Sequence, residues 1–514
     1  VVMTAPVVVW FKRDLRVVDH EALAAAADGP IIPLYVVEPD YWANDFTSGR
    51  QWSFLKDSVL KLDAELTHRG QPLWTAIGQV EEVLERLYQR FQFKKMVSHQ
   101  ETGPNWTFQR DLRVKDWCQN HDVTWNEYRQ HGVIRGLRER QGWAAHWAAL
   151  MDEGQAQVPK KLSGVGAPPK PASEVLKGVS IAEEFLVSSQ EGGRDQGIEL
   201  LASFLNERCE TYRGGMSSPL TGETVCSRLS AHLSLGTLSL REVWQQTLER
   251  RALLKEEAGR SRALRSLKSF QSRLHWHCHF IQKLESEPRL EFEELHRGFI
   301  GLRGSPSELE SERFERFQKG LLGWPFVDAC LRCLASTGWL NFRMRAMLVS
   351  IASYHLWIDW KKTGAQMARW FTDFEAGIHW SQIQMQSGTT GINANRMYSP
   401  VKQSEDQDPN GMFIKRWVPE LDRVPTEWIH QPWRMPLSLQ QKYGCQIGLQ
   451  YPEPIGDPQQ LAREARTKLK LWVDTHDLRP EAQRVLKAHG SRLRQARPRY
   501  GKKSSSSQIA LDLE

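Results

Sequence analysis

The 514-residue chain has no long apolar run and only seven cysteines. No segment reaches the roughly 18–20 consecutive apolar residues that cross a bilayer, so we expect no membrane span. The apolar segment near the N-terminus is too short for a secretory signal, and its charges lie on the wrong side. Scattered cysteines in odd number favour reduced thiols over a disulfide framework. We therefore expect a cytoplasmic protein.

Positive and negative charges balance over most of the chain, and the net excess lies at one end. The formal charge is +7, and residues 486–503 hold seven basic residues and no acid, which leaves zero for the remainder. The basic residues are Lys487, Arg492, Arg494, Arg497, Arg499, Lys502 and Lys503. Such a tail can contact a nucleic-acid backbone, or it can be a solvated tail that aids solubility.

The first 140 residues alternate strand-like and helix-like segments. Between the strand-like runs lie helical patterns over 51–69 and 80–91. This order predicts a doubly wound α/β domain with a parallel sheet, whose ligands bind at the carboxyl ends of the strands. The loop KRDLR (Lys12–Arg16) follows the first strand and could bind an anion or form ion pairs. The strand-like runs are VVVWF at 7–11, IIPLYVVEP at 31–39, PLWTAIG at 72–78 and KKMVSHQE at 94–101.

A connector and a helical region follow. Residues 154–178 are rich in Pro, Gly, Lys and Ser, which predicts a long linker. We assign 1–140 to the α/β domain, 141–196 to the connector and 197–485 to an all-α domain. Residues 486–514 lack periodicity and are expected to form a disordered tail.

Tryptophan is concentrated between residues 324 and 421. Cores favour Leu, Ile and Val, so many Trp beside many polar residues indicate a helical pocket around a large, flat, charged cofactor. A Trp-rich core or a partner surface is the alternative. The residues are Trp324, Trp339, Trp357, Trp360, Trp370, Trp380 and Trp417.

The order of motifs over residues 5–475 resembles the photolyase/cryptochrome family. Tyr212 precedes the second of these motifs. They are VWFKRDLRVVDHEAL near the N-terminus, CSRLSAHLSLGTLS at 226–239, GWPFVDACLRCL, TGWLNFRMRAM, IDW at 358–360 and FIKRWVPEL.

The resemblance implies an α/β antenna domain and a helical domain that binds FAD. An antenna chromophore, folate or deazaflavin, is possible in such proteins. In photolyases, light excites the reduced flavin, and an electron passes to an ultraviolet pyrimidine photoproduct in DNA, whose bonds then split. Cryptochromes keep the fold and flavin but use light for signalling. The resemblance thus implies either a DNA repair lyase or a blue-light photoreceptor.

The SRLS segment is the expected phosphate-binding site. Hydroxyls and free N–H groups at a helix start can hold a phosphate, although an ordinary serine cap is the alternative. By resemblance, Tyr212 contributes as well, and Cys226 replaces a common Thr. The implied pyrophosphate residues are Ser227, Arg228, Leu229 and Ser230.

Four further residues match positions around the flavin ring. Arg345 and Asp373 match an arginine and an aspartate near the ring, and the family pattern pairs Asp373 with Arg228. Glu375 replaces a second Asp that accepts a hydrogen bond from the flavin edge. His379 falls near the position that faces flavin N5, where it would tune the flavin radical.

The implied electron-transfer chain differs from the family pattern. Two of the three family tryptophans align with Ile383 and Ser307, so only Trp360 remains. We predict photoreduction through Trp360 and Trp380, with His379 beside the flavin, although Trp370, Trp339 and Trp324 could supply another route. Each tryptophan could also be plain core.

The implied lesion pocket also differs. Trp276 matches a residue that packs on the flipped dinucleotide. Arg273 replaces a glutamate and Met385 replaces a second tryptophan. A pocket asparagine aligns with Phe342, and Asn341 is adjacent. These four, Arg273, Trp276, Asn341 and Met385, are the expected DNA contacts, and the lesion type stays open.

Two metal-like patterns and one peptide complete the candidates. His275 and His279 have i, i+4 spacing, and Cys330–Cys333 is a lone CxxC, but neither has further ligands, so we predict no metal. The C-terminal QIALDL (Gln508–Leu513) resembles the peptide by which bacterial repair proteins bind the sliding clamp. Otherwise we expect a monomer.

Overall fold

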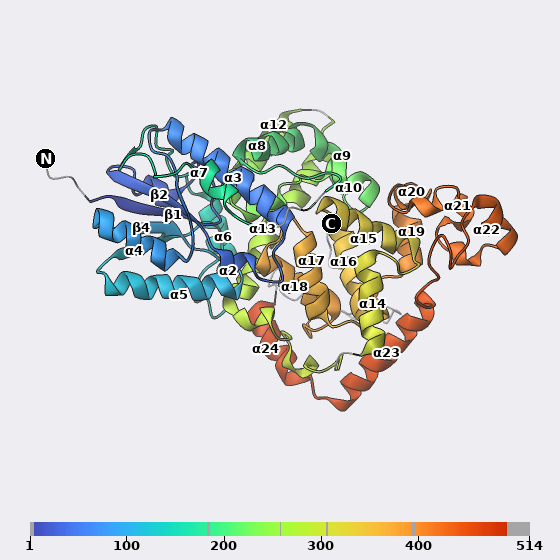
Figure 1. Ribbon diagram of the computed structural model, residues 1–514. Coiled ribbons are helices and arrows are strands. Elements are labelled where there is room, and N and C mark those ends of the chain that lie inside the picture. The colour runs from blue at the N-terminus through green and yellow to red at the C-terminus, as the bar shows by residue number, and fades with distance from the viewer. Residues whose placement is uncertain are drawn as a thin grey trace.

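The computed structural model describes residues 5–490, except 182–183, 185, 258, 305–306 and 393–395. Figure 1 shows an α/β domain, in blue and cyan, beside a larger helical domain coloured green to red. The long helix α13 (Ser261–Ser286) lies near the junction of the two. This arrangement confirms the predicted fold class.

The sheet of the α/β domain is parallel, with the order β3-β2-β1-β4-β5. Strand β5 was not predicted because its sequence, TWNEY, is polar and only half-buried at the sheet edge. The bounds are β1 Val7–Phe11, β2 Pro30–Val37, β3 Trp74–Ile77, β4 Lys95–His99 and β5 Thr124–Tyr128.

Helices cover both faces of this sheet. Because side chains alternate along a strand, Val9 and Phe11 of β1 join the core on one face, and Val8 and Trp10 join the core on the other. The helices are α1 Glu21–Ala24, α2 Pro39–Trp42, α3 Gly49–His68, α4 Val80–Phe91 and α5 Asn105–Asn120.

The connector is more ordered than a flexible linker. It contains α6 (Trp143–Asp152), α7 (Ala172–Lys177) and the two-residue strand β6 (Ser163–Gly164), which pairs with β2. Trp143 is buried, and its indole N–H donates to the Gly132 carbonyl at 2.9 Å. Aromatic anchoring therefore fixes a segment whose composition predicts a linker.

The helical domain contains α8 to α24 and short π and 3-10 turns. Helix α24 ends at His489, so the predicted tail boundary at 486 falls inside a helix. None of the described helices has the length and apolar character needed to cross a membrane. The remaining bounds are α8 Arg194–Ser203, α9 Cys209–Gly215, α10 Pro219–Val225, α11 Ser230–Ser234, α12 Leu240–Glu256, α14 Glu308–Lys319, α15 Pro325–Thr337, α16 Phe342–Ser350, α17 Trp360–Trp370, α18 Ala376–Ser387, α19 Pro400–Gln407, α20 Met412–Trp417, α21 Thr426–Ile429, α22 Leu437–Tyr443 and α23 Pro458–Thr475.

The KRDLR loop after β1 fastens the two domains together. The Leu15 N–H donates to the Leu235 carbonyl at 3.1 Å, and the Arg16 guanidinium donates to the Gly236 carbonyl at 2.8 Å. Gly236 has a φ of +63°, and a Cβ there would lie 2.3 Å from the Arg13 carbonyl oxygen. Only glycine allows the two backbones to approach this closely.

Candidate active site

The buried carboxylate of Asp373 joins three parts of the helical domain. Arg345 of α16 donates to both of its oxygens at 2.9 Å, and the Ser230 hydroxyl of α11 donates to Oδ2 at 2.5 Å. Burial alone would raise the pKa of Asp373, but the Arg345 charge and these hydrogen bonds lower it overall. Asp373 is therefore held as an ionised, fixed acceptor.

The predicted hydrogen-bonded pair of Asp373 and Arg228 is wrong. Arg228 instead lies over the Trp339 ring, with 4.2 Å between its guanidinium carbon and the ring centroid. Arg228 also adopts a left-handed backbone conformation, with φ of +62°. The planar fork of Arg345 matches the carboxylate better than Arg228 can from this position. The Arg228 charge still contributes to the lowered pKa of Asp373.

The SRLS segment lies at the start of a helix, as expected. Helix α11 begins only at Ser230, whose hydroxyl is committed to Asp373, and Leu229 is buried. The Arg208 guanidinium donates to the carbonyls of Cys226 and Ser227, the latter at 3.2 Å. Sequence reasoning did not find Arg208, whose partners include these carbonyls and the Ser203 hydroxyl.

Positive charge gathers around Cys226. Burial raises the pKa of this thiol to about 11, while the charges of Arg228, Arg208, Arg345 and Arg273 oppose that effect. Four arginines within electrostatic range of one half-buried position produce a strongly positive region. Such a region suits an anionic group such as a pyrophosphate.

Tyr212 lies at the edge of this region. It is buried in α9 and packs edge-on against Phe204, with ring centroids 5.4 Å apart. Burial raises the pKa of Tyr212 to about 12, and the charge of Arg273, together with a hydrogen bond to it, opposes the shift. The tyrosine thus helps to position Arg273.

His379 lies beside the Arg345–Asp373 pair in helix α18. Its Nε2 is 2.9 Å from the Gly364 carbonyl oxygen, and because a carbonyl only accepts, Nε2 must carry the hydrogen. Burial lowers the pKa of His379 to about 4, so the ring is neutral at pH 7. Nδ1 is then a hydrogen-bond acceptor.

Three aromatic rings stand in series from His379. The ring centroids of His379 and Trp380 are 4.9 Å apart, and those of Trp380 and Trp360 are 6.1 Å apart. The Trp360 N–H donates to Glu294 at 3.2 Å. The structure thus places the two predicted electron-transfer tryptophans next to each other. Among the described residues, no contact joins the ring of Trp370, Trp339 or Trp324 to another indole.

Glu375 is at the N-terminus of α18 and faces the α/β domain. Its Oε2 is 3.3 Å from the Arg13 guanidinium, whereas Oε1 is buried and has no partner among the described residues. Arg13 was not among the predicted site residues, because nothing in the KRDLR motif indicates which side chain it meets.

The expected DNA contacts separate into exposed and buried residues. Trp276 is half-buried and stacks on Phe280, with ring centroids 5.5 Å apart. The Arg273 guanidinium lies 5.8 Å from the Phe342 ring, and Phe342 is 45% exposed. Met385 is half-buried on α18.

Asn341 does not fit the predicted role of a DNA contact. It is 1% exposed, and its amide donates to the carbonyls of Met216 and Ser217 at 3.1 and 2.8 Å. The residue therefore fixes the start of α16 to the chain after α9. Its exposed neighbour Phe342 is the side chain available to a ligand at this position.

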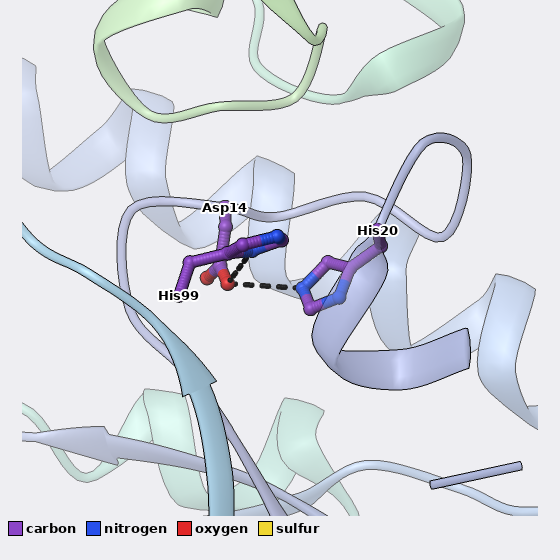
Figure 2. Close-up of side chains that lie close together, drawn as sticks. All are labelled: Asp14, His20 and His99. Atoms are coloured by element: carbon purple, nitrogen blue, oxygen red, sulfur yellow. Dashed lines mark hydrogen bonds and ion pairs between the residues drawn. The ribbon is translucent and has the colours of Figure 1, made fainter. Parts of the chain in front are cut away.

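A second buried cluster lies in the α/β domain, where Asp14, His20 and His99 meet (Figure 2). Asp14 Oδ2 is 2.9 Å from His20 Nε2 and 2.9 Å from His99 Nδ1. Within the described part of the chain, only these three residues have ligand atoms close enough for a metal. However, His20 Nδ1 accepts the Leu23 N–H at 3.0 Å, so neutral His20 carries its hydrogen on Nε2 and cannot ligate through it. The cluster fits a hydrogen-bonded anchor for the loop.

The two metal-like sequence patterns, His275 with His279 and Cys330 with Cys333, lie apart from the Asp14, His20 and His99 cluster. His275 packs against the rings of Trp143 and Trp147, at centroid distances of 5.1 and 4.9 Å. The Cys333 thiol contacts the Thr337 hydroxyl at 4.0 Å.

A cavity of about 80 Å³ lies at the carboxyl ends of β1 and β2, bounded on one side by the helical domain. Aromatic and charged side chains line it, including Trp10, Tyr35, Trp42, Lys12 and Arg110. This is the place where ligands bind to doubly wound sheets.

Comparisons with known proteins agree with this architecture. Residues 7–139 match the DNA photolyase family model, and residues 270–471 match the FAD binding domain of DNA photolyase. A deoxyribodipyrimidine photo-lyase from Agrobacterium fabrum is 28% identical over 478 residues, covering 88% of this chain and 95% of that protein. Cryptochrome DASH from Gloeobacter violaceus is 27% identical, covering 88% and 93%. The crystal structure of a class III photolyase from Agrobacterium tumefaciens superposes with a TM-score of 0.79 at 25% identity, covering 92% and 99%.

The two matched regions define a two-domain flavoprotein with a photolyase-type α/β domain and a FAD-binding helical domain. The chain belongs to the photolyase/cryptochrome family.

The residues of the site fit FAD. The arginines around Cys226 suit its pyrophosphate, and buried atoms without partners, Arg228 Nε and Glu375 Oε1, are available to its polar groups. When bound, FAD supplies light absorption and one-electron chemistry.

Proposed function

We propose that the protein is a blue-light-driven, FAD-dependent lyase that repairs ultraviolet pyrimidine photoproducts in DNA. The observation that carries this proposal is the serial contact of His379, Trp380 and Trp360 beside the Arg345–Asp373 pair. Ring-to-ring contacts inside a buried site give electrons a path from Trp360 and Trp380 toward the flavin. The photo-lyase relatives support the lyase reading.

The protein's own groups have separate tasks in this proposal. Arg345 fixes Asp373 as an acceptor, and neutral His379 offers Nδ1 to an N–H donor. Arg228 and Arg273 bring positive charge to the pyrophosphate region. These groups bind and orient the cofactor without transferring protons themselves.

Trp276 and Phe280 form the surface proposed to receive an extruded base. Stacked indole and phenyl rings offer a platform that tolerates any base, and Arg273 can contact a phosphate or a base carbonyl. Phe342, exposed beside Arg273, adds an apolar contact. We infer a pocket in which a cation, Arg273, and apolar rings stand in place of the Glu and Asn of the family pattern.

The test is illumination of the purified holoprotein with oligonucleotides that each carry one defined photoproduct, either a cyclobutane dimer or a (6-4) product. Restored thymines, absent in the dark, would support repair and identify the lesion. A flavin spectrum without turnover on any lesion would contradict it.

A cryptochrome-type photoreceptor without repair is the second candidate. The observation that favours it is the burial of Asn341, which leaves the lesion pocket without that amide. Light-dependent change in protein conformation, in the absence of any repair, would support this alternative.

The cavity at the carboxyl ends of β1 and β2 is the proposed place for an antenna chromophore. Its aromatic lining suits a planar ring. The cations Lys12 and Arg110 are paired with Asp111, Glu38 and Glu101, so the charge of the lining is balanced. A second absorbing species, extracted from the purified protein besides FAD, would support this assignment.

The remaining proposals concern partners. We infer that a monomer acts on DNA in the cytoplasm, assisted by the basic residues after 486. The clamp-like peptide Gln508–Leu513 lies outside the described residues, so it stays a sequence prediction. Capture by purified sliding clamp should be lost when Leu511 and Leu513 are replaced by Ala; capture that persists would contradict it.

A further inference from the structure

Arg13 crosses from the α/β domain into the cofactor domain. Its Nε donates to the Ser234 carbonyl at 2.9 Å, and Nη2 donates to the Phe374 carbonyl at 3.0 Å. Nη2 also contacts the Ser234 hydroxyl and Glu375 Oε2, the latter at 3.3 Å. One guanidinium therefore ties the end of α11 to the start of α18.

These contacts give the two carboxylate oxygens of Glu375 different surroundings. Burial raises the pKa of Glu375 overall. The Arg13 charge and a backbone hydrogen bond with Gly377 oppose that shift, and the charge of Glu101 adds to it. With Oε2 beside Arg13, the other oxygen, Oε1, is buried without a partner among the described residues. A buried carboxylate oxygen without a donor is costly unless a ligand supplies one.

The immediate surroundings contain no other cation that contacts Glu375 among the described residues. A cavity of only about 10 Å³, room for about one water, lies between Arg13, Glu375, His277 and the β4 loop. The Ser234 hydroxyl, which contacts Arg13, donates to the Phe374 carbonyl at 2.7 Å. Replacement of Arg13 would thus remove the charge partner that the packing provides.

We propose that Arg13 is a positioning residue of the FAD site: the α/β domain uses it to orient Glu375 so that Oε1 accepts a hydrogen bond from the bound flavin. The inference rests on the proposed binding of the flavin beside Glu375. It makes the α/β domain a structural part of the cofactor site, in addition to any antenna role.

The test uses the full-length holoprotein with Arg13→Met and Arg13→Lys. We expect Arg13→Met to weaken FAD rebinding at least tenfold and to shift the flavin midpoint potential, measured by spectroelectrochemistry. Arg13→Lys should recover part of both, because it restores the charge but not the forked contacts with Ser234 and Phe374.

Arg241→Met is the matched control. Arg241 makes an equally buried ion pair across the same domain junction, with Asp19, but it does not contact Glu375. If both variants affect FAD and potential equally, Arg13 only docks the domains, and the proposal fails.

A double-mutant cycle guards against an Arg13 variant that merely unfolds. If Arg13 acts through Glu375, the shift in potential for Arg13→Met plus Glu375→Gln should equal that of Glu375→Gln alone. Additive shifts would overturn the proposal. Because potential and FAD affinity are measured without DNA, this result is independent of whether the wild type repairs any lesion.

Discussion

Asp373 shows how one buried carboxylate can fix three parts of a domain. Its oxygens accept two hydrogen bonds from Arg345 and one from Ser230. The two partners together compensate its negative charge. Removing one partner of a buried pair usually costs more than the pair contributes, because an unpaired charge remains.

Replacement of Arg345 by Met should therefore damage the site strongly. We expect a loss of about 3–5 kcal/mol in the free energy of unfolding and little FAD retained on purification. The stability and FAD retention of Arg345→Lys should lie between those of Arg345→Met and the wild type. Chemical denaturation and the flavin-to-protein absorbance ratio measure both effects, and full FAD retention in Arg345→Met would refute the role.

The buried His379 predicts a pH dependence of stability. Its folded pKa of about 4 lies below the ordinary 6.5 because of burial, so the unfolded chain binds the proton more readily. Its contribution is present above pH 6.5 and is lost as the pH falls toward 4. By the shift, the loss is on the order of 3 kcal/mol.

Replacement of His379 by Asn should reduce this slope of unfolding free energy against pH between 6.5 and 4. The control is His146→Asn, because His146 is exposed on α6. Equal slopes in His379→Asn and wild type would show that the histidine does not titrate as a buried group.

At the scale of helices and loops, packing of α17 against α18 sets the distance between the tryptophans. Gly364 allows this approach, since a Cβ there would lie 2.5 Å from the Trp380 ring. Helix α17 therefore brings Trp360 and Trp380 within 6.1 Å.

Trp360→Phe and Trp380→Phe should each slow flavin photoreduction under blue light at least tenfold. Phenylalanine keeps an apolar ring but is harder to oxidise than an indole. Trp370→Phe is the control, because Trp370 packs on Phe317 outside this series. Unchanged rates in both variants, measured by transient absorption, would exclude the route.

The docking loop predicts a cost for any side chain at position 236. Gly236→Ala should lower the free energy of unfolding by about 3–5 kcal/mol, because left-handed strain adds to a backbone clash with Arg13. Gly136 is the matched control: its φ of +70° is similar, but a Cβ there meets nothing within 4 Å. We expect Gly136→Ala to cost only about 1–2 kcal/mol. Equal losses would show that the close approach is not limiting.

Sequence patterns predicted the elements better than their partners. The apolar runs of β1 to β4 follow directly from burial, whereas β5 escaped because an edge strand needs few apolar residues. The resemblance to the family placed Arg345, Asp373 and His379 in one site. It could not reveal the contact of Arg13 with Glu375, which depends on how two domains pack.

Two local errors have the same origin. Asp373 accepts hydrogen bonds from Arg345 rather than Arg228, and the Asn341 amide donates to the carbonyls of Met216 and Ser217. Both outcomes depend on side-chain direction at a helix start, which linear spacing does not contain.

At the scale of the whole molecule, the charge distribution predicts salt-dependent DNA binding. Six of the seven basic residues of the tail follow residue 490, and Lys487 already pairs with Glu139 on the folded body. Truncation after Gly490 should lower the slope of log affinity against log salt by up to about 5, since each phosphate contact contributes about 0.9. Fluorescence anisotropy on duplex DNA measures it; an unchanged slope would mean that the tail does not touch DNA.

The close approach of Gly236 to the Arg13 carbonyl also limits how the two domains can be exchanged between relatives. A chimera that takes its α/β domain from a relative would carry a docking loop that fits the relative's helical domain and not this one. Residues 12–16 and 234–241 would have to be transplanted together, as one graft taken from both halves of the donor.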